Sequence, residues 1–114
     1  VEKGGFPWTN GRFPQFDRFY EENKAAIGEA VDSADTLLLV QPNNPDGQRF
    51  PRARLLAWHA ELAARGGCLI VDEAFIDADP ADSLVPLAGQ PGLVVLRSVG
   101  KFFGLAGARV GFVF

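Results

Sequence analysis

The chain has 114 residues, of which 47% are hydrophobic and 22% are charged, and its formal net charge is −3. This composition is typical of one soluble globular domain or a piece of one, and it is neither that of a disordered chain nor that of a membrane protein. Without a basic stripe or an apolar run long enough to cross a bilayer, nucleic-acid and membrane partners are not expected. The single cysteine, Cys68, cannot form an internal disulfide, which favours a reducing compartment and a cytoplasmic location.

The first half of the chain predicts a loop, a helix, a strand and a turn. Residues 1–14 have no usable periodicity, whereas residues 16–31 place apolar side chains at helical spacing. Residues 36–40 form a continuous apolar run of strand length, typical of a strand buried on both faces of a parallel sheet. Residues 41–50 are rich in Asn, Pro, Asp and Gly and predict a turn segment.

The second half continues the alternation of helix and strand. Pro51 suits the first turn of a helix, which the glycine pair Gly66 and Gly67 would stop. Within that helix we expect His59 on the solvent face. Three further segments have strand character: 69–71, 93–96 and 110–114. Residues 78–92 predict a loop with a helical turn near Leu84, and the alternation as a whole predicts an α/β layered sheet.

Polar side chains follow three of the predicted strands. Asn44 comes after the first strand, Asp72 closes the second, and residues 98–101 follow the third. Ligands of parallel α/β sheets bind at the carboxyl ends of the strands. We therefore expect these three segments to meet at one edge of the sheet.

The carboxylate and the amide at this edge each have a functional and an ordinary interpretation. Asp72 ends an apolar strand, where a positive partner such as a protonated ring nitrogen would offset its desolvation; otherwise it is a capping or loop-bracing residue. Pro45 holds Asn44 extended, so its amide can be presented to a ligand, but the same residues also make a good turn. Glu73 is expected on the opposite side of the strand end, paired to an arginine.

Lys101 and Arg109 are the notable cations of the last seventeen residues. Lys101 lies among glycines and aromatic residues, and apolar surroundings favour a neutral, nucleophilic amine of the kind carbonyl chemistry needs. A surface lysine with a buried stem is the alternative. Arg109 enters an apolar strand and would need an anion there, and a phosphate would satisfy it together with the hydroxyl of Ser98.

Taken together, these motifs resemble a known family. They are Asn44-Pro45-x-Gly47, Asp72-x-x-Phe75, Ser98-x-x-Lys101 and Arg109. In this order and spacing, over residues 36–114, they resemble the fold-type I pyridoxal-phosphate enzymes of the class I/II aminotransferase family. The resemblance implies an α/β fold in which residues 1–114 form part of the large, three-layer cofactor-binding domain. We expect both termini to be truncated, because the chain begins without a methionine and stops within the apolar run 110–114. It also implies a mostly parallel sheet with a last antiparallel strand, and a homodimeric enzyme.

The resemblance also implies a role for each residue. Lys101 would bond covalently to the aldehyde of pyridoxal 5′-phosphate and act in catalysis. Asp72 would pair with the pyridinium nitrogen, and Asn44 would donate to the phenolic oxygen. Ser98 and Arg109 would hold the phosphate, and no metal is expected.

Two departures from the aminotransferase pattern favour one branch of the family. Phe75 stands where a tyrosine is usual, and Gly100 stands where a serine is common. The chain is therefore most similar to threonine-phosphate decarboxylases of cobalamin biosynthesis, which implies decarboxylation of L-threonine O-3-phosphate to aminopropanol phosphate. A histidinol-phosphate-type aminotransferase is the alternative, and a non-catalytic α/β domain is the alternative from another class.

Overall fold

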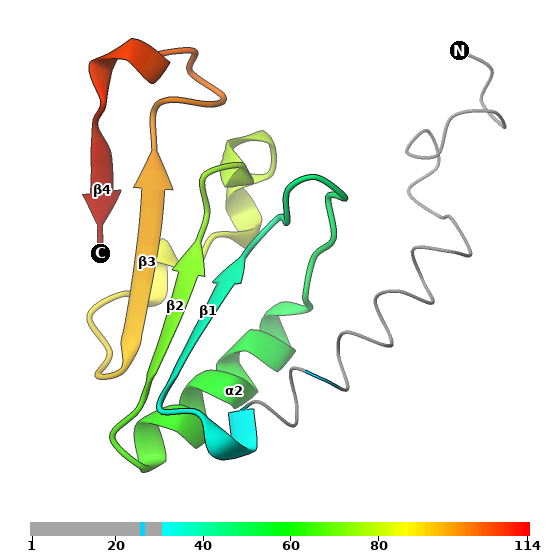
Figure 1. Cartoon of the computed structure of the whole chain (residues 1–114), viewed down its shortest axis with the longest axis vertical. Coiled ribbons are helices and arrows are strands. Elements are labelled where there is room, and N and C mark those ends of the chain that lie inside the picture. The colour runs from blue at the N-terminus through cyan, green and yellow to red at the C-terminus, as the bar shows by residue number, and fades with distance from the viewer. Residues whose placement is uncertain (1–25, 27–30) are drawn as a thin grey trace, which may run out of the picture.

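A computed structural model describes residue 26 and residues 31–114, which fold around a four-stranded sheet (Figure 1). Its strands, in spatial order, are β1 (Thr36–Val40), β2 (Cys68–Asp72), β3 (Leu93–Ser98) and β4 (Gly111–Val113). The first three are parallel, and β4 runs antiparallel to β3. The predicted α/β architecture, mostly parallel with a last antiparallel strand, is confirmed.

The bounds of a strand agree with the prediction where residues next to it in the sequence end it, and differ where a pairing strand extends it. The bounds of β1 are those predicted, because its apolar run ends where the polar turn begins. Strand β3 runs two residues past the predicted end at residue 96, because Arg97 and Ser98 pair with Phe112 and Gly111 of β4. An antiparallel partner can extend a strand beyond its apolar run, since the ladder uses backbone groups alone.

Helix α2 (Arg52–Ala64) connects β1 to β2 and packs against β2. Pro51 occupies the N-cap rather than the first turn. The predicted glycine stop is confirmed: the Gly66 amide donates to the Ala63 carbonyl at 3.0 Å, and the Gly67 amide to the Leu62 carbonyl at 2.7 Å. Gly66 has a φ of +78°, a left-handed conformation that glycine adopts without a Cβ penalty.

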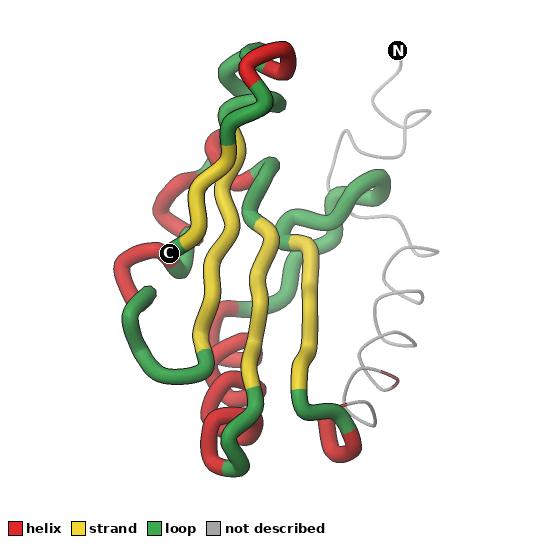
Figure 2. The backbone as a smooth tube through the Cα atoms, turned by 60° about the vertical axis from the view of Figure 1, so that its left-hand side comes forward, coloured by secondary structure: helices red, strands yellow, loops and turns green. Residues whose placement is uncertain are grey.

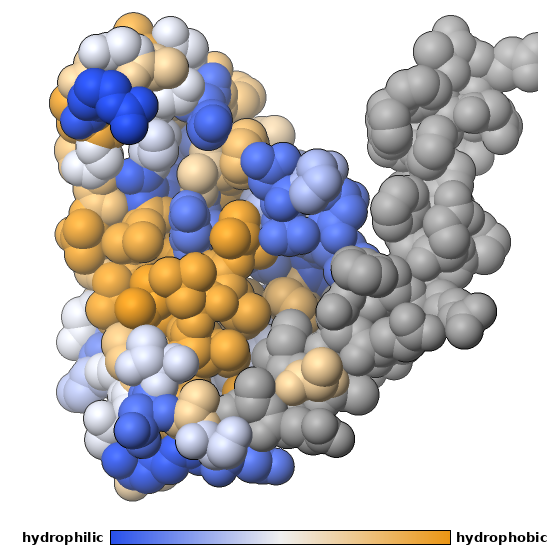
Figure 3. All heavy atoms as spheres, viewed as in Figure 1, coloured by the Kyte–Doolittle hydropathy of each residue, from blue (hydrophilic) through white to orange (hydrophobic). Residues whose placement is uncertain are grey.

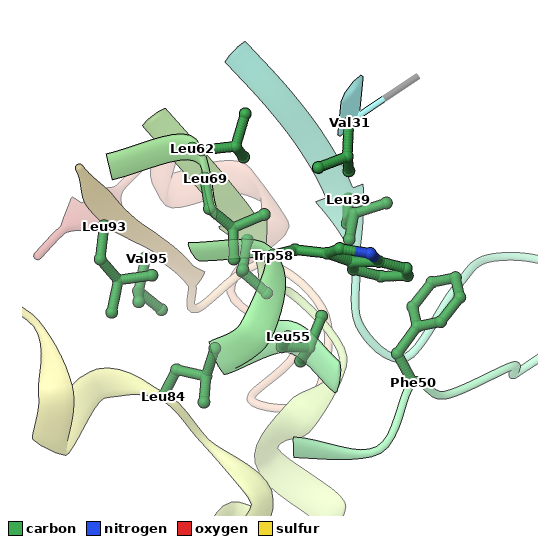
Figure 4. Close-up of a cluster of buried hydrophobic side chains, with 11 residues drawn as sticks. Val31, Leu39, Phe50, Leu55, Trp58, Leu62, Leu69, Leu84, Leu93 and Val95 are labelled. Carbon is green, nitrogen blue, oxygen red and sulfur yellow. The ribbon is translucent and has the colours of Figure 1, made fainter. Parts of the chain in front are cut away.

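The hydrophobic core lies between α2 and one face of the sheet (Figure 4). From the helix, Leu55, Trp58 and Leu62 pack onto alternate residues of the strands. The strand residues of the core are Leu39, Leu69, Val71, Leu93 and Val95. Phe50, which precedes the helix, closes this cluster with its ring edge-on to Trp58 at a centroid distance of 5.2 Å.

His59 is a correction to the sequence analysis. It does not lie on the solvent face but is buried, with 8% of its surface exposed, and its Nε2 atom lies 2.9 Å from the Pro91 carbonyl oxygen. A ring N–H can donate to that carbonyl, which satisfies the buried polar group. The segment that leads into β3 covers this side of α2, and the spacing within the helix carries no information about that segment.

Between β2 and β3 the chain forms three short 3-10 turns where one turn within a loop was predicted. They are η1 (Ile76–Ala78), η2 (Pro80–Asp82) and η3 (Val85–Leu87). Residues 31–33 are helical, so the predicted helix over 16–31 ends near its expected position. The rest of that helix, residue 26 apart, and the predicted loop over 1–14 lie outside the described residues.

A methyl group at position 67 is expected to destabilise this fold. A Cβ built there would lie 2.5 Å from the Asp35 carbonyl oxygen, which accepts the Cys68 amide at 2.8 Å. Gly67→Ala should therefore cost about 1–3 kcal/mol of stability, because backbone must move to relieve the clash. Thermal unfolding followed by circular dichroism measures this. Gly107→Ala is the matched control, since a Cβ at Gly107 meets nothing within 4 Å; an equal loss in both variants would contradict the prediction.

The opposite face of the sheet is apolar and open in the described part of the chain. Leu38, Ile70 and Val94 lie side by side in register on this face, away from the α2 core. Figure 3 shows apolar atoms gathered over the strands in this view, and Leu38 and Val113 are 57% and 73% exposed. Within the described residues, no helix combines the length and hydropathy needed to cross a bilayer.

We expect the 114-residue chain to associate with itself through this face, because exposed apolar patches are buried by association. Sedimentation velocity measures the effect. Leu38→Lys, which puts a charge on the face, should lower the associated fraction, whereas Ala57→Lys on the exposed side of α2 should not. A monomeric unmodified chain at micromolar concentration would contradict this.

Candidate cofactor-binding site

The carboxyl ends of β1, β2 and β3 meet at one edge of the sheet, as predicted (Figures 1 and 2). Val40, Asp72 and Leu96 lie side by side in register at this edge. The pairing continues one residue further, because the Gln41 amide donates to the Asp72 carbonyl and the Glu73 amide donates to the Leu96 carbonyl, both at 2.8 Å. The position of Asp72 is thus set by hydrogen bonds to both neighbouring strand ends.

The Asp72 side chain lies at the open face of this edge. Val71 and Glu73 are buried on the α2 side, and because side chains alternate along a strand, Asp72 points the other way. Its Oδ1 atom accepts the Ala74 amide at 3.0 Å. Among the described residues nothing else donates to this half-buried carboxylate, so its second oxygen is available to a ligand.

The connection from β3 to β4, residues 99–110, extends beyond the edge and returns beside Ser98, which pairs with Gly111. It includes the short turn η4 (Ala106–Ala108). The Gly100 amide donates to Ser98 Oγ at 3.0 Å, which leaves the hydroxyl proton of Ser98 to be donated elsewhere. A Cβ at Gly100 would lie 3.3 Å from Ser98 Oγ, so the backbone approaches this hydroxyl closely.

Lys101 lies over the segment that follows β2. Its Nζ atom is 5.5 Å from the centroid of the Phe75 ring, within the range of a cation–π contact. Lys101 and the Asp72–Phe75 motif therefore come together, although β2 and β3 are separated by twenty residues of chain. This contact is not predictable from the sequence, in which Phe75 stands out only as lacking the hydroxyl of the usual tyrosine.

The apolar enclosure predicted for Lys101 is not formed by the described residues. The lysine side chain is exposed, and so are its aromatic neighbours Phe102 and Phe103, which pack edge-on against each other at 5.3 Å. Phe102 and Phe103 are neighbours of Lys101 in the sequence, but closeness in sequence does not by itself bury an amine. Burial requires that another segment pack against the loop, and no described segment does so.

Arg109 is at the same edge but does not contact Ser98 in the described part of the chain. It is exposed, adopts a left-handed backbone conformation with φ of 53°, and lies 3.5 Å from the Ala106 carbonyl oxygen. It comes two residues before Gly111, the partner of Ser98 in the sheet. The backbone therefore brings the two residues to one edge, and their joint hold on a phosphate stays a prediction.

The turn after β1 separates the roles of its two asparagines. The Asn43 side chain donates to Asp46 Oδ1 at 2.9 Å and so braces the turn. Asn44 is exposed, and among the described residues its amide has no hydrogen-bond partner. Asn44 is therefore the asparagine that is free to meet a ligand, and it is the one the sequence singles out.

A buried ionic cluster lies directly behind the site. Glu73 is fully buried and pairs with Arg97 at 3.8 Å, which confirms the expected partner type and identifies the arginine. Arg97 also pairs with Asp77. No sequence pattern pointed to Asp77, whereas an arginine next to the end of a predicted buried strand was a signal for Arg97.

Comparison with known proteins agrees with this geometry. Residues 13–114 match the family described as aminotransferase class I and II. The chain is 59% identical over 92 residues to a threonine-phosphate decarboxylase of Pseudomonas aeruginosa, covering 81% of this chain and 28% of the relative. It is 38% identical over 112 residues to a histidinol-phosphate aminotransferase of Streptomyces avermitilis, covering 96% of this chain and 30% of the relative. The chain thus spans less than a third of the length of these relatives.

Solved structures show the same fold. A histidinol-phosphate aminotransferase from Clostridium acetobutylicum matches with a TM-score of 0.70 and 28% identity, over 78% of this chain and 28% of that one. A decarboxylase from Sulfurospirillum multivorans matches with a TM-score of 0.60 and 28% identity, over 81% and 25% of the two chains. The chain therefore belongs to the aminotransferase class I and II family of pyridoxal-phosphate-dependent enzymes.

Proposed function

We propose that this chain is part of the cofactor-binding domain of a pyridoxal-phosphate-dependent lyase. The proposed reaction is the decarboxylation of L-threonine O-3-phosphate to aminopropanol phosphate and CO₂, in cobalamin biosynthesis. The observation that carries the proposal is the convergence of Asp72, Ser98 and Lys101 at one sheet edge, with Lys101 over the segment that follows Asp72. The catalytic unit would be a longer cytoplasmic protein acting as a homodimer.

The residues at this edge have the chemistry that pyridoxal phosphate requires. A half-buried carboxylate, Asp72, has one oxygen without a described donor, which suits a protonated ring nitrogen. The exposed amine of Lys101 and the hydroxyl of Ser98 follow on the adjacent strand. A Cβ at Gly100 would lie 3.3 Å from Ser98 Oγ, so glycine lets the backbone lie close to this hydroxyl. The donor set therefore fits the cofactor.

Lys101 and Asp72 would do the chemical work of the chain. When bound, pyridoxal phosphate supplies an aldehyde that bonds to amines and a ring that withdraws electrons from the substrate. Lys101 would hold the aldehyde carbon covalently and, once released from it, carry a proton to or from the substrate. Asp72 would keep the ring nitrogen protonated, because its negative charge favours the positive form.

The remaining residues would orient the cofactor. Ser98 would donate its hydroxyl proton to the phosphate, since its oxygen already accepts the Gly100 amide. Arg109 would turn toward the same phosphate from the end of the β3–β4 connection and form charge-assisted hydrogen bonds. The unpartnered amide of Asn44 would donate to the phenolic oxygen.

Two observations favour decarboxylation over transamination. The identity to the Pseudomonas threonine-phosphate decarboxylase, 59%, exceeds the 38% to the Streptomyces histidinol-phosphate aminotransferase. In addition, Phe75 presents a ring to Lys101 and no hydroxyl to the cofactor. A histidinol-phosphate-type aminotransferase is the second candidate, since that relative matches over almost the whole chain.

A product assay on the whole enzyme tests the proposal. The enzyme is incubated with threonine phosphate, and separately with histidinol phosphate and 2-oxoglutarate. Release of CO₂ without a keto product is expected in the first reaction and no transfer in the second. A keto product in the second reaction would instead identify an aminotransferase. A protein that develops no visible absorption band with pyridoxal phosphate would be a non-catalytic α/β domain.

A further inference from the structure

We propose that Arg97 is a positioning residue that sets the spacing between Asp72 and the Ser98–Lys101 segment. This inference depends on the proposed function only for the binding of pyridoxal phosphate at this edge. Arg97 directly precedes Ser98, and its partner Glu73 directly follows Asp72. The ion pair therefore joins the two strand ends that carry the site.

The geometry follows from the alternation of side chains along the strands. Asp72 pairs in register with Leu96, and the Glu73 amide donates to the Leu96 carbonyl at 2.8 Å. Asp72 and Ser98 lie on the open face of the sheet, whereas Glu73 and Arg97 lie on the opposite face. A change in the contact between Glu73 and Arg97 would therefore move the backbone of the adjacent residues, Asp72 and Ser98.

The Arg97 side chain contacts three acceptor residues of the connection between β2 and β3. Its guanidinium pairs with Asp77 of η1, lies 3.8 Å from Glu73 Oε2, and lies 3.5 Å from the Ser83 hydroxyl. Glu73 is held in turn, because it accepts the Ser83 hydroxyl and the Leu84 amide, both at 2.6 Å. The guanidinium is planar and its donors are fixed in direction, so it clamps these acceptors more rigidly than an ammonium would.

Stability alone does not account for this cluster. Glu73 is fully buried, and the side chains of Asp77 and Arg97 are 5% and 21% exposed. Buried ion pairs gain little net stability, since desolvation offsets the attraction. Within the described residues Asp77 Oδ2 and Arg97 Nε are also buried without hydrogen bonds, a cost that an apolar cluster would not carry. Asp77, Arg97 and Ser98 line one pocket, so the cluster lies at the strand end that carries Ser98.

The test compares cofactor binding and absorption in the whole enzyme with Arg97→Met, Arg97→Lys and Glu73→Gln. Loss of the clamp in Arg97→Met should raise the dissociation constant of pyridoxal phosphate by about tenfold to a hundredfold, as for other outer partners of ligand-holding groups. It should also shift the position of the visible band of the bound cofactor, because Asp72 moves relative to the ring. Arg97→Lys, which keeps the charge, should recover part of both effects, and Glu73→Gln should show the same changes in smaller size.

Arg49→Met is the matched control. Arg49 also pairs with two carboxylates, Asp79 at 2.6 Å and Asp82 at 3.0 Å, but this cluster is more exposed and joins no strand end of the site. The dissociation constant of pyridoxal phosphate from the Arg49→Met enzyme should stay within about twofold of the value for the unmodified enzyme. A purely structural role for Arg97 would lower the unfolding temperature and leave the band of the folded enzyme unchanged.

The outcomes separate this inference from the proposed function. Equal cofactor binding and an unshifted band in Arg97→Lys and Glu73→Gln would overturn it; these two variants decide the matter if Arg97→Met does not fold. An unmodified enzyme that binds the cofactor but releases no CO₂ from threonine phosphate would overturn the proposed substrate. The comparison of variants would still decide the role of Arg97.

Discussion

Lys101→Ala is expected to abolish the visible absorption band of the whole enzyme with pyridoxal phosphate and to lower turnover by at least about a thousandfold. The reason is that, in the proposed function, Lys101 would both hold the cofactor covalently and carry the proton. Its amine is exposed beyond the carboxyl end of β3 and lies 5.5 Å from the Phe75 ring centroid, so a ligand at this edge of the sheet can reach it. Absorption spectra and CO₂ release measure the two effects separately.

Two further variants define what the loss means. Lys101→Arg keeps a cation near Phe75 but cannot bond to the aldehyde carbon, so it should behave like Lys101→Ala. Arg54→Ala removes a cation that lies 5.9 Å from the Trp58 ring on α2, on the face of the sheet opposite Asp72, and should keep the band and the turnover. A Lys101→Ala enzyme with the band intact would exclude Lys101 as the covalent residue.

Asp72→Asn should lower turnover by about a hundredfold to a thousandfold while the fold and the covalent hold on the cofactor persist. The amide has the same shape and can still accept the Ala74 amide, which now donates to Asp72 Oδ1 at 3.0 Å. It has no negative charge, so it no longer favours a protonated ring nitrogen, and the ring withdraws electrons less well. Steady-state turnover and the position of the visible band give the result.

The matched control for this change is Asp79→Asn. Asp79 pairs with Arg49 at the surface, where its side chain is 57% exposed, and exposed ion pairs contribute little. Turnover should therefore remain within about twofold of the unmodified enzyme. If Asp72→Asn gave the same small change, the carboxylate would have no role in the chemistry.

Together these variants test the site at its two ends, the amine and the carboxylate, while the Arg97 variants test the spacing between them. Each variant is expected to change a different property of the enzyme. Loss of Lys101 should remove the covalent bond, loss of the Asp72 charge should leave the bond and slow the reaction, and loss of the Arg97 clamp should mainly weaken binding.

Much of the fold follows from local properties of the chain. The apolar run of β1 is bounded by polar turn residues, so its limits are visible without knowledge of its neighbours. The helix stop at Gly66 is equally local, since it requires only a residue that tolerates positive φ. Because parallel strands end at the same edge, the alternation of strand and helix was also enough to predict that Asp72 and Ser98 would lie at one edge of the sheet.

The amino-acid sequence was therefore enough to predict the layered fold, the edge with the candidate site, and the residues at that edge. It was not enough to predict that His59 is buried against Pro91, that Lys101 lies over Phe75, or that Arg97 is the partner of Glu73. These contacts escape prediction because hydrophobic spacing reports only which face of an element is apolar. Which atom from a distant segment meets that face depends on register, crossovers and loop paths, and these are fixed by packing across the whole domain.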